Sequence, residues 1–125
     1  MSLSVASETT NVVQASFLLE EGVEAVRILR DSSWSNINNL TKGVPYYLEF
    51  SGSKWGTTTT STYIDGKFER SFVVDSVRRD INDDISSSGI TDQNSNKVSV
   101  FVSCFGTNGT TTQEIIFYIT NIFNS

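Results

Sequence analysis

Trp34 stands among short polar side chains, an arrangement typical of a surface that stacks on sugar rings. Its polar neighbours are Asp31, Ser32, Ser33, Asn36 and Asn38. A flat aromatic ring can pack against the face of a sugar while hydroxyl, amide and carboxylate groups bond to the sugar hydroxyls. A tryptophan that covers the edge of a folded domain explains the same residues. Trp34 is therefore a candidate sugar contact, with a packing role as the alternative.

Trp55 is a second aromatic candidate, because it lies between Lys54 and Gly56 in a predicted hairpin. An exposed tryptophan at such a position can serve as a platform for a ligand. The threonine run at 57–60 that follows is typical of a strand. We therefore favour a surface turn with a strand behind it.

An acidic stretch resembles the start of a calcium-binding loop, with Asp80, Asn82, Asp83 and Asp84. Closely spaced oxygen ligands suit a hard cation. The sixth position is Ile85 where such a loop needs glycine, and the twelfth is Thr91 where it needs glutamate. The sequence therefore predicts a solvated acidic loop and no metal site.

Residues for catalysis are scarce in this chain, which contains no histidine. The single cysteine, Cys104, falls on the apolar face of a predicted strand, where burial disfavours the thiolate. Asp65 and Glu69 form a carboxylate pair, but the sequence does not set their separation, on which glycoside hydrolysis depends. We expect no catalytic residues, no cofactor and no enzymatic activity.

The composition is that of one globular domain with a single core. The chain has 125 residues, 38% hydrophobic and 18% charged, and a formal net charge of -5. The nine basic residues include no cluster larger than Arg78 and Arg79, which argues against nucleic acid as a partner. One cysteine cannot form an internal disulfide, so packing alone must stabilise the fold.

The first eleven residues are polar and are predicted to be flexible. They contain neither a basic start nor the apolar stretch of an export signal. No window in the chain approaches the roughly 18 to 20 apolar residues of a membrane span. We therefore expect no membrane insertion, and a location in the cytoplasm or export by a non-classical route.

Residues 12–19 carry apolar side chains at the spacing of an amphipathic helix. Asn11 is placed to cap its start and Gly22 to end it. A helix of about ten residues is too short to be stable alone in water, so its apolar side must pack on its own domain or on a second chain. If a second chain covers it, the predicted dimer interface consists of Val12, Val13, Ala15, Ser16, Phe17 and Leu19.

Beyond Gly22, short apolar runs alternate with turn residues, as in an antiparallel β fold. The predicted strands are residues 23–29, 45–50, 58–64, 68–77, 98–105 and 114–122, with polar loops at 80–95 and 106–112. Asp65 and Gly66 form the strongest hairpin signal, because both tolerate a positive φ. The absence of a predicted long helix between strands favours a mainly β antiparallel sandwich preceded by a short α-helix.

Three blocks of this sequence resemble the fungal immunomodulatory proteins. They are FLLEEGVEAVRILRDSSW at 17–34, LTKGVPYYLEFSGSKWG at 40–56 and GITDQNSNKVSVFV at 89–102. The Glu-Ile-Ile string at 114–116 and the lack of histidine also fit. The blocks cover about half the chain, whereas residues 57–88 match poorly and Cys104 is unusual for that family.

The resemblance implies an immunoglobulin-like, fibronectin III-like sandwich that forms a homodimer by exchanging its helix and first strand, residues 12–29, with residues 30–125 forming the sandwich. It implies binding of cell-surface carbohydrate, red-cell agglutination and stimulation of immune cells, without catalysis or metal. By resemblance, the sugar contacts fall on Trp34, Asn38 and Lys97, with Tyr118 as the nearest replacement for the family's C-terminal aromatic. An interaction or adhesion module of the same fold that binds no sugar is the alternative function.

Overall fold

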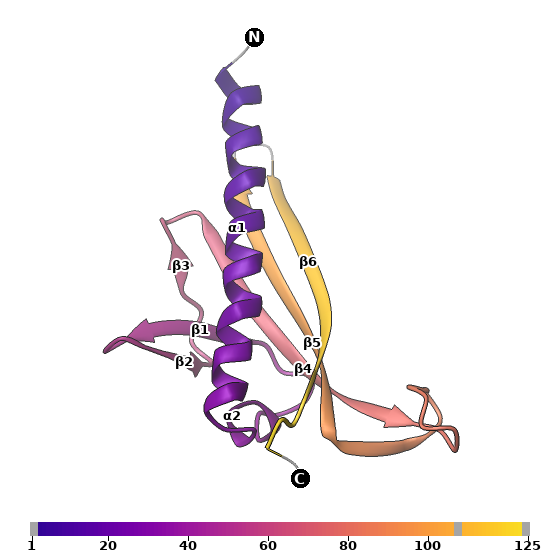
Figure 1. The fold of residues 1–125 in the computed structure, drawn as a ribbon. Coiled ribbons are helices and arrows are strands. Elements are labelled where there is room, and N and C mark those ends of the chain that lie inside the picture. Colours follow the sequence, from indigo (N-terminus) through magenta and orange to yellow (C-terminus); the bar gives the residue numbers. More distant parts are fainter. Residues whose placement is uncertain (1–2, 107–108, 124–125) are drawn as a thin grey trace.

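A computed structural model describes residues 3–106 and 109–123, which form a helix packed on an antiparallel sheet (Figure 1). The helices are α1 (Leu3–Ser32) and the short α2 (Ser35–Asn38). The strands are β1 (Tyr46–Ser51), β2 (Lys54–Thr58), β3 (Tyr63–Ile64), β4 (Phe68–Arg79), β5 (Ile90–Gly106) and β6 (Gly109–Thr120). The predicted mainly β, antiparallel fold class with an N-terminal helix is confirmed.

The described strands belong to one sheet, in the order β2-β1-β4-β5-β6, with β3 paired to β4. Every neighbouring pair is antiparallel. Helix α1 runs across one face of this sheet, in the position that a second sheet has in a sandwich (Figure 1). The second layer of the fold is thus α1.

The core lies between α1 and the three long strands β4, β5 and β6. Alternate residues of each strand point toward α1, because successive strand side chains face opposite sides of a sheet. The fully buried members include Ala25, Val26, Phe72, Val74, Val98 and Val100, each with an exposed fraction of 0%. Each of the larger apolar side chains contributes roughly 1.5 to 3 kcal/mol when buried, so this cluster holds the helix on the sheet.

Helix α1 is much longer than the sequence analysis predicts. Residues 3–11, predicted to be flexible, and residues 23–29, predicted to be the first strand, are both helical. Leu19, Val23 and Val26 continue the helical spacing past the predicted end, so one apolar stripe packs along β4, β5 and β6. Gly22 lies inside this helix, at a point where α1 packs so close to β5 that a Cβ atom would meet Val100 Cγ1 at 3.0 Å.

Two more predictions about strands are wrong. Residues 58–64 are not one strand, because Gly52 and Ser53, both with positive φ, turn the chain early and pair Lys54–Thr58 with β1. Residues 90–95 are not loop, because the ladder of β4 and β5 continues past an irregularity at Ser76 and Val77. The predicted turn at Asp65 and Gly66 is confirmed, with φ values of 53° and 70°.

The last hairpin starts earlier than predicted. Strand β6 begins at Gly109, and β5 extends to Gly106. The predicted loop at 106–112 is therefore largely strand, and its residues 107 and 108 lie outside the described residues. Thr110, Thr111 and Thr112 pair in register with β5, as β-branched residues do in strands.

Candidate functional site

Trp34 and Asn38, two of the predicted sugar contacts, lie at the junction between α2 and β5. The indole Nε1 of Trp34 donates a hydrogen bond of 3.2 Å to the carbonyl oxygen of Gln93. The side chain of Asn96 donates to Oδ1 of Asn38 at 3.1 Å, and Asn96 is only 1% exposed. Both polar groups are thus used to fasten α2 to the sheet, which agrees with the packing alternative for Trp34.

Lys97 and Tyr118, the other two predicted sugar contacts, lie on the opposite face of the sheet. Because Asn96 faces α1, its neighbour Lys97 points the other way. Lys97 pairs in register with Tyr118 on β6 and with Asp75 on β4. The structure therefore brings the four predicted residues together as two pairs on different faces and not as one site.

The predicted dimer interface divides between the two faces of α1. Ala15 and Leu19 are 3% and 4% exposed, because they pack against the sheet of their own chain. Val12, Val13 and Phe17 are 55%, 48% and 66% exposed. Ser16 is also exposed, with its hydroxyl 3.3 Å from the side-chain oxygen of Gln113. Val13 and Phe17, four residues apart, thus form an uncovered apolar pair on the side of α1 away from Ala15 and Leu19.

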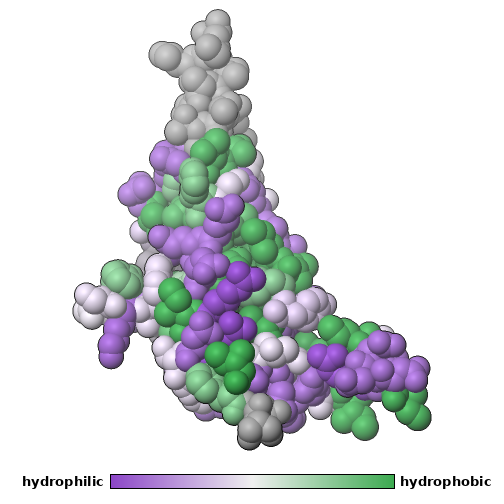
Figure 2. All heavy atoms as spheres, in the orientation of Figure 1, coloured by the Kyte–Doolittle hydropathy of each residue, from purple (hydrophilic) through white to green (hydrophobic). Residues whose placement is uncertain are grey.

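The N-terminal end of α1 extends beyond the sheet (Figure 1). Two polar bonds join this part of α1 to the rest of the fold: Lys67 Nζ donates to Asn11 Oδ1 at 3.0 Å, and Gln113 Nε2 donates to the carbonyl of Val12 at 3.4 Å. From Asn11 back to Leu3 the backbone continues as helix for about another 12 Å, at 1.5 Å per residue. Apolar surface gathers where the helix leaves the sheet (Figure 2).

Arg70 is a buried cation that the sequence analysis did not identify. Its side chain is 5% exposed, and its Nη1 donates to the carbonyl of Leu18 at 3.0 Å and to Glu21 Oε1 at 2.7 Å. Its guanidinium lies 5.6 Å from the centre of the Trp55 ring. Arg70 thus fastens the middle of α1 to β4. Its place between Phe68 and Phe72 on the buried face of the alternating strand is the sequence signal that could identify it.

A groove of about 600 Å³ lies between the C-terminal part of α1 and the β1–β2 hairpin. It is lined by Ile28, Leu29, Ser32, Asn36, Phe50, Ser53, Lys54, Trp55, Gly56 and Thr57. The rings of Phe50 and Trp55 are 5.1 Å apart between centroids, and Phe50 is 61% exposed. Trp55 therefore contributes to a hollow of the size that small ligands and peptide segments occupy.

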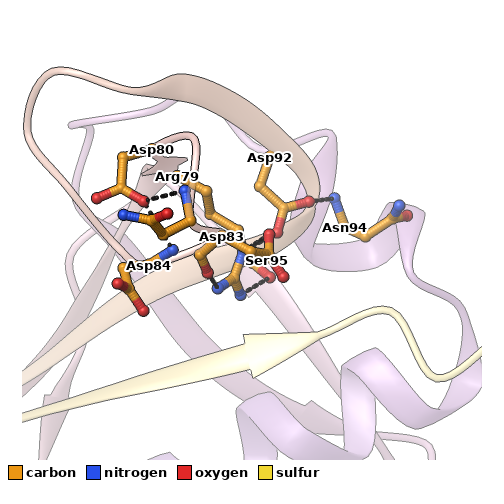
Figure 3. Close-up of polar contacts among 8 residues, drawn as sticks. Arg79, Asp80, Asp83, Asp84, Asp92, Asn94 and Ser95 are labelled. Carbon is orange, nitrogen blue, oxygen red and sulfur yellow. Dashed lines mark hydrogen bonds and ion pairs between the residues drawn. The ribbon is translucent and has the colours of Figure 1, made fainter.

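The acidic loop is organised by its own backbone and by Arg79 (Figure 3). Oδ1 of Asp80 accepts hydrogen bonds from the backbone N–H groups of Asn82 and Asp84 at 2.9 and 3.0 Å. Arg79 Nε donates to Asp92 Oδ2 at 2.6 Å, and this bond, followed by one from the backbone N–H of Asn94, lowers the pKa of Asp92. The described residues contain no group of three His, Cys, Asp or Glu side chains that could hold a metal ion.

The remaining reactive side chains have structural surroundings. Cys104 is 6% exposed and belongs to the core beneath α1. Glu69 accepts a hydrogen bond from the hydroxyl of Ser61, and Asp65 lies in the β3–β4 turn with a positive φ. Neither group sits in the groove, whose only charged lining residue in the described chain is Lys54.

Comparison with known proteins yields no relative of this chain. No family model matches it, and no curated protein or solved structure matches it either. The resemblance to fungal immunomodulatory proteins therefore stays a prediction. None of the helices within residues 3–106 and 109–123 is long and apolar enough to cross a membrane.

Proposed function

We propose that this chain is a non-enzymatic binding module that works as a homodimer joined through the exposed face of α1. One observation carries the proposal: Phe17, the most exposed residue of the apolar group on α1, is 66% exposed beside Val13. Residues four apart in a helix lie on the same face, so these two side chains form one patch. Such a patch on a helix that already has a covered apolar face is a feature of association surfaces.

A two-fold pair of α1 helices suits this patch, because a two-fold interface uses the same surface on both copies. Packed helices lie about 8 to 10 Å apart, close enough for Phe17 and Val13 of each copy to meet those of the other. Burying a side chain such as Phe17 contributes roughly 1.5 to 3 kcal/mol, and the symmetry doubles that contribution.

The dimer proposed here does not require exchange of the helix between copies. The face of α1 that carries Ala15 and Leu19 is packed on the sheet of its own chain, which satisfies the need of that face for a partner. The opposite side of the helix, with Val13 and Phe17, remains available for a second copy. Side-by-side association of complete protomers is therefore the simpler arrangement.

Cross-linking tests the proposed interface directly. In a Cys104→Ser chain that also carries Val13→Cys, mild oxidation is expected to give a covalent dimer, because the two introduced thiols lie near the two-fold axis. Cysteine at Ile81, which is 98% exposed on the loop between β4 and β5, is the matched control and should give little dimer. Equal cross-linking at both positions would contradict the interface.

Carbohydrate binding is the second candidate function, on the face of the sheet opposite α1. Asp75, Lys97 and Tyr118 stand side by side on β4, β5 and β6, and Tyr118 is 51% exposed. An aromatic ring beside an amine and a carboxylate can stack on a sugar and bond to its hydroxyls. A dimer would present two such sites, which raises avidity for a cell surface. A glycan array that gives the same signal for the chain and for Tyr118→Ala would contradict this site.

A further inference from the structure

Strand β2 forms one edge of the sheet and lies beside the groove. Among the described residues it pairs with β1 alone, and the turn between the two strands consists of Gly52 and Ser53, both with positive φ. Such a two-residue turn is closed by a hydrogen-bonded pair, which here is Ser51 and Lys54. This pair sets which backbone groups of β2 face the sheet.

Backbone groups in an antiparallel strand alternate between the two sides of the strand. Because Lys54 bonds to β1, Gly56 and Thr58 do so as well, and the N–H and C=O groups of Trp55 and Thr57 point away from the sheet. No other described backbone group bonds to those of Trp55 or Thr57. The free edge of β2 thus offers two donors and two acceptors at the spacing of a strand.

The same two residues line the groove, whose opposite wall is Ile28 and Leu29 of α1. A chain segment laid along β2 would therefore place alternate side chains between Trp55 and Ile28, which is 48% exposed. Polar groups of Ser32 and Asn36 lie farther along the same wall. The groove thus combines free backbone bonding groups with an apolar slot.

The single charged side chain among the described residues that line the groove favours an occupant with an acidic group. Lys54 is the one charged side chain among the residues that line it, in a chain whose formal net charge is -5. An acidic side chain opposite Lys54 in an added strand would pair with the Lys54 ammonium across the two strands. We infer that the occupant is a polypeptide. An extended peptide forms backbone hydrogen bonds with the free edge of β2 and at the same time places alternate side chains in the apolar slot.

We propose that the groove binds an extended peptide segment of a partner protein, which adds a strand to the free edge of β2. The segment carries apolar side chains at alternate positions and a carboxylate at the end near Lys54. Its affinity comes from the backbone groups of Trp55 and Thr57, and its selectivity from the slot between Trp55 and Ile28. This site is separate from the Phe17 patch, so it operates in a monomer as well as in a dimer.

A displayed library of random heptapeptides tests the proposal, with three forms of the chain as bait. Proline at position 57 removes the outward N–H while leaving the bonds to β1 in place. Peptides enriched on the native chain are expected to bind Thr57→Pro about tenfold more weakly or worse, and to bind Thr57→Val unchanged. Failure to enrich any peptide, or equal binding to both variants, would overturn the proposal.

Hydrogen exchange tests the same proposal on the native chain, so misfolding of a variant cannot affect the result. An enriched peptide is expected to slow exchange at the amides of Trp55 and Thr57, while the amides of Lys54 and Gly56, already bonded to β1, serve as internal controls. Unchanged exchange at Trp55 and Thr57 in the saturated complex would overturn the proposal. Oligosaccharide binding that is lost on Trp55→Ala and kept on Thr57→Pro would assign the groove to sugars and overturn it too.

Discussion

Helix α1 buries apolar side chains on one face and exposes an apolar pair, Val13 and Phe17, on the other, and the comparison between the two faces shows how one element serves both fold and function. Ala15, Leu19 and Val26 are at most 4% exposed beneath the helix, whereas Val13 and Phe17 on the other face are 48% and 66% exposed. The first face is accounted for by the sheet it covers. The second has no such partner within the described chain, and an amphipathic surface helix ordinarily carries polar residues there.

The largest expected effect comes from a cavity on the covered face. Replacing the buried Leu19 by alanine removes its side chain from the core between α1 and the sheet, which costs about 2 to 5 kcal/mol. Urea denaturation should show this loss in a Phe17→Ser background, where association does not contribute to stability. A loss below about 0.5 kcal/mol would contradict the conclusion that the face of α1 with Leu19 is packed in the core.

Overpacking at Gly22 should give the next largest effect. A Cβ atom at Gly22 would lie 3.0 Å from Val100 and 3.1 Å from Arg70, so Gly22→Val forces α1 away from β4 and β5. We expect a loss of about 1 to 3 kcal/mol in the free energy of unfolding. The matched control is Gly56→Ala, whose nearest neighbour would be 3.7 Å away, and which should change stability much less.

The smallest effect concerns the end of β4 and β5 near Arg79 and Asp92. Ion pairs stabilise this end, whereas apolar burial stabilises the packing of α1 on the sheet. Arg79 lowers the pKa of Asp92, so the folded chain keeps this carboxylate charged at a lower pH than the unfolded chain does. The stabilisation is therefore complete above about pH 4, the ordinary pKa of aspartate, and is lost as pH falls through the lower pKa of the folded state.

Thermal unfolding between pH 2 and 7 measures that contribution. The melting temperature of Asp92→Asn is expected to lie slightly below that of the native chain at pH 7, with the difference vanishing at low pH. A difference that stays constant from pH 7 to pH 2 would show that Asp92 acts through shape and not through its charge.

The sequence patterns predict some parts of this fold better than others. Alternation of side chains located the central part of β5, and the positive φ tolerance of Asp65 and Gly66 located a turn, because both signals are local. The sequence does not predict the full length of α1, because Gly22 is a typical helix end, and the close approach of Val100 that favours glycine at this position is a tertiary contact.

The candidate sites are harder to predict from the sequence than the strands and turns, because they depend on tertiary contacts. The resemblance groups Trp34 and Asn38 with Lys97, but strand alternation places Lys97 on the other face of the sheet from Asn96 and Asn38. The sequence predicts Phe17 and Leu19 in one interface, yet Leu19 is buried against the sheet and Phe17 is exposed on another side of α1. The groove beside Trp55 forms where α1 lies next to the β1–β2 hairpin. This is a tertiary arrangement, and no local sequence pattern predicts it.

Light-scattering mass after size exclusion tests the association of α1 most directly. The native chain is expected to have the mass of a dimer, and Phe17→Ser that of a monomer, because two buried Phe17 side chains contribute about 4 kcal/mol, or roughly a thousandfold in Kd. Ile81→Ser, on the loop between β4 and β5 and 98% exposed, is the control and should remain dimeric. A monomeric native chain, or a Phe17→Ser dimer as tight as the native one, would contradict the account.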